Sequence, residues 1–244
     1  MDPLTAVALG ALQGVTEWLP VSSSGHLVAA QSFFNVAPGV LFDVMLHVGT
    51  LLAVIAVFWK DIIQLFTKNH KWLAYLIAAS VPIAIAGFLL HDQIEAMFSS
   101  VTTVGIALLC TGLILFMTRN ANGRQSIGWK NSLLVGVSQA LALVPGISRS
   151  GITMSTAMIA GVTREQAARF SFLLSIPAVL GAAAFELIGT PIGTIEWAPT
   201  LIGLLTATIV GFLSIKLLLN VIKKGKFWLF AIYCWALGLL LLLA

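Results

Sequence analysis

The sequence predicts an all-α polytopic membrane protein, with six transmembrane helices and two re-entrant helix–loop–helix hairpins in an inverted-topology repeat. Three observations support this prediction. Of the 244 residues, 59% are hydrophobic and 9% are charged, whereas soluble domains are about 25% charged. Six apolar stretches are long enough to cross a bilayer. Two further apolar regions carry similar polar breaks. This composition excludes a soluble enzyme, a disordered chain and a secreted disulfide scaffold.

The six predicted crossings follow from length, because about 20 mainly apolar residues span the hydrocarbon core. They cover approximately residues 41–59, 72–90, 100–118, 166–187, 197–219 and 227–243. The other apolar regions, 4–34 and 132–160, are interrupted by proline, serine and glycine. Each half is too short to cross, and irregular backbone at membrane depth must be buried in protein or line a wet cavity. Both regions are therefore predicted to enter and leave the membrane on one side.

The positive charges support this topology. Three predicted crossings separate the two hairpins, so the hairpins must open to opposite faces. This arrangement places 12 of the 13 Lys and Arg residues on one face, and the remaining one, Arg149, lies in the second break. Cytoplasmic loops are enriched in Lys and Arg. The basic face is therefore predicted to be cytoplasmic, and both termini and the mouth of the first hairpin are predicted to face outward.

The two broken regions resemble each other at an offset of 126 positions, so that Gly10 corresponds to Gly136 and Gln13 to Gln139. The matched residues at the breaks are Ser22, Ser24 and Gly25 in the first and Ser148, Ser150 and Gly151 in the second. We expect one integral membrane domain built from two repeats, about 1–118 and 130–244. Interrupted helices at corresponding positions of inverted repeats point to a binding site near the midplane.

The chemistry of such a site favours an anion. The second leg of each hairpin begins near Gly25 or Gly151 at membrane depth, where its free amides and positive dipole end face the centre. Two such ends form a cradle suited to phosphate. Arg149 adds a permanent charge with a bidentate fork. A buried cation requires a partner, which is a ligand phosphate, Glu17, or both.

Gln13 and Glu17 are four residues apart and share one helix face. An ionisable residue in an otherwise apolar segment is a functional candidate. Glu17 is either a structural partner of Arg149 or a ligand for a hard cation or a general base, with Gln13 adding a carbonyl oxygen. Asp43 and His47, in the first full span, either line the same cavity or connect helices.

Hydroxyl groups and one imidazole form a compact cluster after Glu17. Its members are Ser22, Ser23, Ser24 and His26. Serines ahead of a helix often serve only as N-caps. A hydroxyl beside an imidazole and a carboxylate is also the arrangement of an activated nucleophile. The corresponding hydroxyls of the second break either cap the helix or donate to phosphate oxygens; they are Ser148, Ser150 and Thr153.

These residues resemble the undecaprenyl-diphosphate phosphatase family, also called the bacitracin resistance protein (BacA/UppP) family. Residues 13–17 (QGVTE) are similar to its [E/Q]-x-x-x-E element, and residues 20–26 (PVSSSGH) to its serine–histidine loop. Residues 145–153 (PGISRSGIT) are similar to its PGxSRSxxT element. The resemblance covers essentially the whole chain, and the three motifs together are specific.

The resemblance implies a fold with an interdigitated inverted repeat in the bacterial cytoplasmic (inner) membrane, and an active site open to the periplasmic or outer face. It implies hydrolysis of undecaprenyl diphosphate to undecaprenyl phosphate and inorganic phosphate. This reaction recycles the lipid carrier for peptidoglycan synthesis, cell wall biogenesis and cell shape, and confers bacitracin resistance. The implied cofactor is Mg²⁺ or Ca²⁺. The implied partners are a polyprenyl diphosphate lipid and the bilayer, without nucleic acid, and a homodimer is left open.

Carried over to this chain, the resemblance makes Glu17 a metal or acid–base residue, Arg149 the phosphate clamp, and Ser23 or His26 the nucleophile. In the first route Ser23 attacks with His26 as base, and in the second His26 attacks directly. The expected substrate-binding residues are Gln13, Ser22, Ser24, Ser148, Ser150 and Thr153. Glu17 and Gln13 are the expected metal ligands. Position 13 is Gln where many members have Glu, which weakens the case for two carboxylates on one metal.

The main alternative is a secondary transporter or flippase for a phosphorylated lipid carrier, because inverted repeats with broken helices are typical of that class. A transporter needs an anion site, but it does not need a hydroxyl, an imidazole and a carboxylate together. The clustered groups therefore favour an enzyme.

Overall fold

The computed structural model describes residues 1–36, 39–98, 100–189 and 196–243. Within these ranges every regular element is a helix, and an isolated bridge joins Gln125 and Val162. Five of the described helices are long and apolar enough to cross a membrane. They are α3 (Val40–Thr67), α4 (His70–Leu89), α6 (Val101–Met117), α9 (Arg164–Gly189) and α10 (Trp197–Lys223). Five of the six predicted crossings are therefore confirmed as helices of sufficient length.

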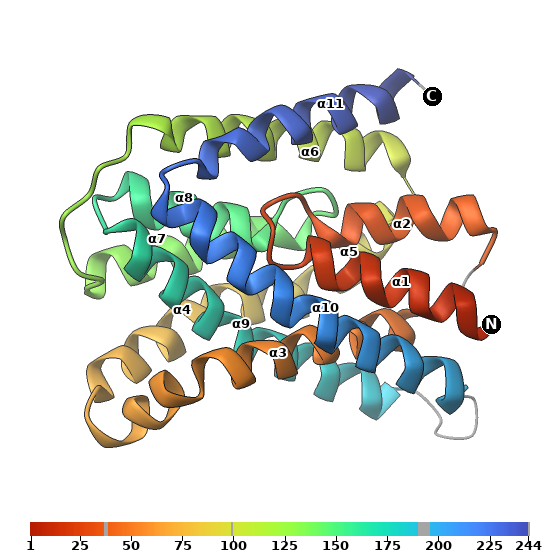
Figure 1. The fold of residues 1–244 in the computed structure, drawn as a ribbon, viewed down its shortest axis with the longest axis horizontal. Coiled ribbons are helices and arrows are strands. Elements are labelled where there is room, and N and C mark those ends of the chain that lie inside the picture. Colours follow the sequence, from red (N-terminus) through yellow and green to blue (C-terminus); the bar gives the residue numbers. More distant parts are fainter. Residues whose placement is uncertain (37–38, 99, 190–195, 244) are drawn as a thin grey trace.

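The sixth predicted crossing is a shorter helix. A 3-10 turn at Phe227–Leu229 leads into α11 (Phe230–Leu243), which has 14 residues. At 1.5 Å per residue, the apolar segment 227–243 reaches about 25 Å, less than the usual hydrocarbon thickness. Helix α11 lies along α6 at the top of Figure 1. A short helix α5 (His91–Phe98) connects α4 to α6.

Both interrupted regions form a helix, a bend and a second helix, as predicted. The first comprises α1 (Pro3–Thr16) and α2 (Ser23–Phe34), and the second comprises α7 (Trp129–Ala140) and α8 (Arg149–Ile159). In Figure 1 the two pairs extend from opposite ends of the bundle, and their bends meet near its middle. The contact is close, since a Cβ at Gly25 would lie 3.6 Å from Gly146 Cα.

The matched serines and glycines of the two breaks have the same local role. Ser22 and Ser148 are the N-caps of α2 and α8, and each side chain accepts a hydrogen bond from the amide of a glycine three residues later. The Oγ–N distances are 3.4 Å to Gly25 and 3.1 Å to Gly151. Ser22 has a φ of 65°, a conformation that non-glycine residues rarely adopt and that is often found at functional sites.

Helix packing exchanges partners between the two halves of the chain. Helix α1 packs along α10, α7 packs along α4, and α3 packs on α9. The matched glycines Gly10 and Gly136 allow close approach of α1 to α10 and of α7 to α4. A Cβ at Gly10 would collide with the Gly203 carbonyl oxygen. A Cβ at Gly136 would lie 2.6 Å from the backbone of Ala79. The pairing of α1 with a helix of the second half therefore mirrors the pairing of α7 with a helix of the first.

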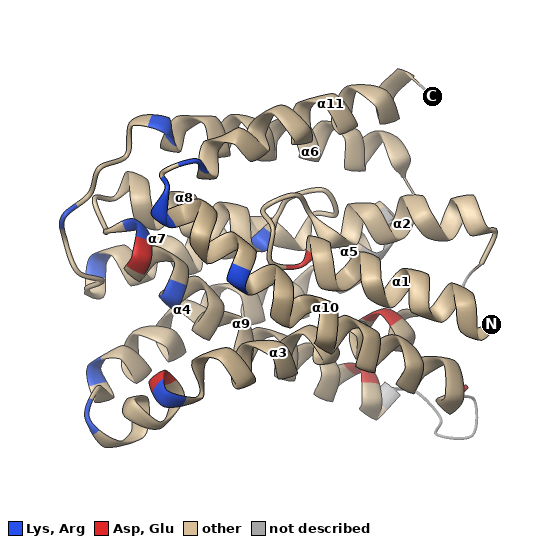
Figure 2. Ribbon diagram, in the orientation of Figure 1, with Lys and Arg blue, Asp and Glu red and all other residues tan. Residues whose placement is uncertain are grey.

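The charged residues are distributed unevenly along the bundle. Figure 2 shows most Lys and Arg segments at the left end, whereas both termini lie at the right. Tryptophans of membrane proteins are enriched at the membrane–water interfaces, and Trp18 departs from this tendency. Trp18 is completely buried and packs edge-on against Phe172, with ring centroids 5.3 Å apart. It anchors the first bend in the protein core.

Candidate active site

A buried ion pair joins the two bends. Glu17 is the C-cap residue of α1, and Arg149 is the first residue of α8. Arg149 Nη2 donates to Glu17 Oε1, and the two side chains are 15% and 5% exposed. The Arg149 guanidinium also lies over the Trp18 ring, 5.5 Å from its centroid. The bends therefore bring together the carboxylate and the guanidinium that the sequence predicts for one site.

The second oxygen of Glu17 is surrounded by hydrogen-bond donors. Ser23 Oγ donates to Glu17 Oε2 at 2.6 Å, and Gln13 Nε2 donates to the same oxygen at 3.0 Å. His47 Nε2 from α3 lies 3.4 Å from it. Charge-assisted hydrogen bonds of this kind stabilise an ionised carboxylate. Among these groups, Ser23 carries the hydroxyl whose proton Glu17 can accept.

His47 belongs to this cluster, although the sequence left its role open. Its Nδ1 lies 2.8 Å from the Asp43 carbonyl oxygen, so each of its two ring nitrogens lies near an oxygen atom. Gln31 Nε2 of α2 donates to Asp43 Oδ1 at 2.6 Å. The spacing of Asp43 and His47 was the only sequence signal for this part of the site.

His26 faces a different set of partners from Ser23. Its Nδ1 lies 2.7 Å from the Ser22 carbonyl oxygen, and its Nε2 lies 2.7 Å from the hydroxyl of Tyr233 in α11. The two rings are nearly parallel, with an interplanar angle of 8° and centroids 5.7 Å apart. Sequence reasoning missed Tyr233, because a single tyrosine in an apolar helix gives no pattern that connects it with a histidine 207 positions earlier.

The remaining predicted hydroxyls lie at the bends in pairs. Ser22 Oγ is 3.3 Å from Ser24 Oγ, and Ser148 Oγ is 3.2 Å from Ser150 Oγ. Ser150 Oγ donates to the Leu19 carbonyl oxygen at 3.4 Å, which ties the second bend to the first. These serines therefore border the contact between the two bends.

Two threonines hold the second bend in place through hydrogen bonds to its backbone. Thr153 is fully buried, and its hydroxyl bonds the Arg149 carbonyl oxygen at 2.7 Å and Ser171 Oγ of α9 at 2.6 Å. Its observed partners thus fix the α8 backbone. Thr111 of α6, which the sequence did not single out, accepts from the Ser148 amide at 3.2 Å and donates to the Gly146 carbonyl oxygen at 3.0 Å.

Two buried polar atoms of the site are left over for a ligand. Within the described residues, Gln13 Oε1 and Arg149 Nη1 have no hydrogen-bond partner. The first is an acceptor suited to a hard cation, and the second is a donor suited to a phosphate oxygen. In the described part of the chain, no three His, Cys, Asp or Glu residues form a cluster that could hold a metal by themselves. Mg²⁺ is usually bound through one or two carboxylates plus substrate phosphates. The two residues that the sequence predicts as ligands offer one carboxylate, on Glu17, and one unpaired amide oxygen, on Gln13.

The carboxylates and imidazoles of the site belong to the first hairpin and α3. At the repeat offset, Glu17 corresponds to Leu143 and His26 to Ile152. The second hairpin therefore has neither the carboxylate nor the imidazole of the first, and it contributes Arg149 to the site. The two hairpins therefore build one site with a division of roles.

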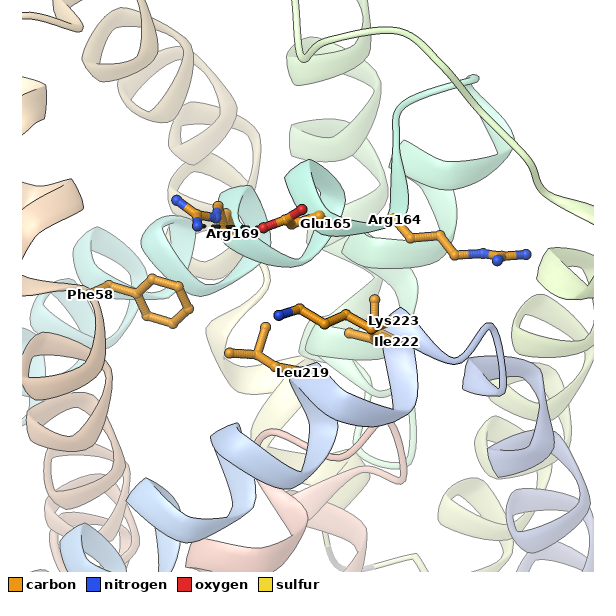
Figure 3. A pocket seen from close by; sticks show the side chains of 7 residues that line it. All are labelled: Phe58, Arg164, Glu165, Arg169, Leu219, Ile222 and Lys223. Atoms are coloured by element: carbon orange, nitrogen blue, oxygen red, sulfur yellow. Dashed lines mark hydrogen bonds and ion pairs between the residues drawn. The ribbon is translucent and has the colours of Figure 1, made fainter.

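A separate pocket of about 310 Å³ lies among charged residues of α9 and α10, as Figure 3 shows. It is lined by Phe58, Arg164, Glu165, Arg169, Leu219, Ile222 and Lys223. Arg169 Nη1 bonds Asp61 Oδ1 at 2.8 Å, and Arg169 Nη2 bonds Glu165 Oε1 at 3.5 Å. Its cations are thus partly neutralised within the protein, and none of the predicted site residues lines it.

Comparison with known proteins identifies similar chains over the full length. The family model for the bacitracin resistance protein BacA matches residues 6–240. An undecaprenyl-diphosphatase of Desulforapulum autotrophicum is 42% identical over 276 aligned positions, covering 100% of this chain and 99% of the relative. Undecaprenyl-diphosphatases of Halothermothrix orenii and Moorella thermoacetica are 39% and 43% identical. Those alignments cover 100% and 96% of this chain, and 98% and 94% of the relatives.

Proposed function

We infer the activity of this chain from its family, because it belongs to the bacitracin resistance protein BacA family and its full-length relatives are undecaprenyl-diphosphatases. The chain is a membrane phosphatase that hydrolyses undecaprenyl diphosphate to undecaprenyl phosphate and inorganic phosphate. This reaction returns the lipid carrier to cell wall synthesis and supports bacitracin resistance. The observation that carries the chemistry is the buried contact of Glu17 with both Arg149 and Ser23.

The proposed first step is attack by Ser23. Arg149 binds the terminal phosphoryl group through its free Nη1, and the amides at the start of α8 add further donors. Ser23 Oγ forms a bond to the terminal phosphorus, its proton passes to Glu17, and the bond to the bridging oxygen breaks to release undecaprenyl phosphate. Phosphoryl transfer depends mainly on positioning and charge neutralisation, which these groups supply.

The second step removes the phosphoryl group from Ser23. Water attacks the phosphoserine, His26 takes up one water proton at Nε2, and the serine oxygen recovers the proton held by Glu17. Inorganic phosphate leaves and the hydroxyl is restored. The contact between Ser23 and Glu17 favours Glu17 over His26 as the base of the first step. Direct attack by His26 is less favoured, because Tyr233 occupies its Nε2.

A divalent cation, Mg²⁺ or Ca²⁺, is the proposed cofactor. Glu17 and Gln13 Oε1 are the residues that would hold it. When bound, the cation would neutralise negative charge on the diphosphate. Because position 13 is Gln, Glu17 is the one carboxylate of this pair that could bind the cation.

The proposed topology has six crossings, with α11 as the sixth, and two re-entrant hairpins in an inverted repeat. The exchanged packing of α1 with α10 and α7 with α4 supports the repeat. The gathering of Lys and Arg at one end supports a cytoplasmic assignment of that end in the bacterial inner membrane. The mouth of the first hairpin, and with it the active site, then opens to the outer face.

Phosphate release from purified, detergent-solubilised protein tests the function. We expect turnover of a C55 polyprenyl diphosphate in the presence of divalent cation, and its loss in Glu17→Ala. A transporter or flippase would release no phosphate under these conditions, because it moves its substrate without breaking the phosphoanhydride bond. Near-native turnover by Glu17→Ala would refute the role of this carboxylate.

A further inference from the structure

The hydroxyl of Tyr233 contacts His26 from the last helix of the chain. We propose that Tyr233 is a positioning residue for the phosphatase reaction: its hydroxyl holds the His26 imidazole in one tautomer and orientation. This inference rests on the proposed function and adds a residue that lies outside the three sequence motifs. It follows from the hydrogen bond and the parallel ring contact between α2 and α11.

The hydrogen bonds define the tautomer of the neutral ring. A backbone carbonyl oxygen can only accept, so the contact of His26 Nδ1 with the Ser22 carbonyl oxygen at 2.7 Å places a proton on Nδ1. Nε2 of the neutral ring then carries the lone pair, and the Tyr233 hydroxyl donates to it at 2.7 Å. The second hydrogen bond of a histidine is the usual means of setting its tautomer.

The position of α11 indicates that this contact is part of how the bend is supported. Cys234, next to Tyr233, lies with its Sγ 3.4 Å from the Pro20 carbonyl oxygen. Two adjacent residues of α11 therefore contact the two ends of segment 20–26. At the second bend, Thr111 of α6 plays the comparable part, because it hydrogen-bonds both Gly146 and Ser148. Each bend is thus contacted by the last α-helix of the other half of the chain, the first bend by α11 and the second by α6.

The consequence concerns when His26 can act. Its Nε2 is the nitrogen with an available lone pair, and the Tyr233 hydroxyl covers that lone pair. Before His26 accepts a proton or contacts phosphate through Nε2, this hydrogen bond must break or its proton must shift. Tyr233 therefore keeps His26 turned toward α11 while Ser23 and Glu17 perform the first step.

Removing only the hydroxyl tests the proposal. Tyr233→Phe keeps the ring against His26, and Tyr75→Phe is a matched control at the other tyrosine of the chain, whose ring packs beside Trp129. We expect kcat of Tyr233→Phe to fall about 2- to 12-fold, the range that loss of one hydrogen bond produces, with KM changed less than twofold. Tyr75→Phe should match the wild type. Equal kcat for both variants and the wild type would overturn the proposal.

A double-mutant cycle separates positioning from a purely structural role. If Tyr233 acts through His26, Tyr233→Phe should cause no further loss of single-turnover rate in a His26→Gln background. The same loss in both backgrounds would show that Tyr233 acts independently of His26, which contradicts the proposal.

Nitrogen-15 NMR of histidine-labelled protein gives a readout that does not depend on activity. The wild type should show a neutral His26 with a protonated Nδ1 and a hydrogen-bonded, unprotonated Nε2, and Tyr233→Phe should shift the Nε2 resonance, assigned by its absence in His26→Gln. A wild-type ring protonated on Nε2 alone would overturn the proposal, even if Tyr233→Phe failed to fold. Absence of phosphatase activity in the wild type would instead refute the proposed function and leave the NMR result standing.

Discussion

Glu17 and Arg149 lie 132 positions apart in the sequence and form an ion pair at the point where the two bends meet. The pair is mostly buried, so each charge depends on the other for compensation. The pair uses only part of the hydrogen-bonding capacity of Arg149. Its Nη2 bonds Glu17, whereas its Nη1 has no partner within the described structure and remains free for a ligand. The same contact thus joins the two hairpins and leaves Arg149 Nη1 available for the proposed phosphate contact.

Arg149→Lys should reduce kcat/KM at least about 100-fold, because a lysine provides a point charge without the bidentate fork that can contact Glu17 and phosphate together. Arg169→Lys is a matched control at the basic end, where the arginine is 43% exposed and bonds Asp61. The control should keep at least half of the activity. Phosphate release by both variants measures the difference, and an active Arg149→Lys would argue against the clamp.

Ser23→Ala should abolish both turnover and covalent phosphate incorporation. The reason is that the hydroxyl in contact with Glu17 is the proposed nucleophile. Acid-quenched protein given a terminally labelled diphosphate should carry label on Ser23 in the wild type, as determined by mass spectrometry. Ser138→Ala, whose hydroxyl bonds its own helix in α7, is the control and should label normally. Label on His26 in the wild type would instead favour direct attack by the imidazole.

The sequence was sufficient to predict the parts of the site that lie in motifs. Both breaks carry proline, serine and glycine in an otherwise apolar chain, so their positions and the pairing of Glu17 with Arg149 could be anticipated. Residues supplied by distant helices could not. Thr111 and Tyr233 contact the bends from α6 and α11, and their spacing along the chain has no relation to the motifs. His47 of α3 was predicted, together with Asp43, either to line the cavity or to connect helices, and it lies beside Glu17.

Element lengths and local burial were also only partly predictable. Hydropathy marked segment 227–243 as a crossing, but its helices are shorter than the other five because a 3-10 turn precedes α11. Tryptophans are usually enriched at the membrane–water interfaces, but Trp18 is completely buried. The bend turns it into the core against Phe172, since the first helix ends at Thr16, two residues earlier.

Gly146→Ala should destabilise the second bend. Gly146 has a φ of 99°, and a Cβ there would lie 2.6 Å from the Val104 carbonyl oxygen and 2.7 Å from Ala107 Cβ. Strain and overpacking together should lower the free energy of unfolding by about 2–4 kcal/mol. Gly181→Ala is the control, because no atom lies within 4 Å of the Cβ it would add. Thermal unfolding in detergent compares the two, and equal melting temperatures would contradict the expected strain.

Gln13→Glu should reduce the concentration of divalent cation needed for half-maximal activity several-fold. The change adds a second carboxylate four residues before Glu17, and carboxylate oxygens are preferred ligands of Mg²⁺ and Ca²⁺. It also removes the donor that bonds Glu17 Oε2 at 3.0 Å, so activity without added cation should fall. Titration of chelator-treated protein with Mg²⁺ measures both effects. An unchanged titration curve would place the cation away from position 13.

Cysteine labelling in intact cells should assign the two ends of the bundle to opposite faces of the membrane. Helix α3 has 28 residues, about 42 Å of helix, which exceeds the thickness of the hydrocarbon core. Ser32 precedes this helix, Asn69 follows it, and both side chains are exposed. In a background with Cys110 and Cys234 replaced by alanine, a membrane-impermeant maleimide should label Ser32→Cys but should label Asn69→Cys only after lysis. The reverse pattern would place the basic end outside and the mouth of the first hairpin in the cytoplasm, where the proposed site could not act on substrate at the outer face.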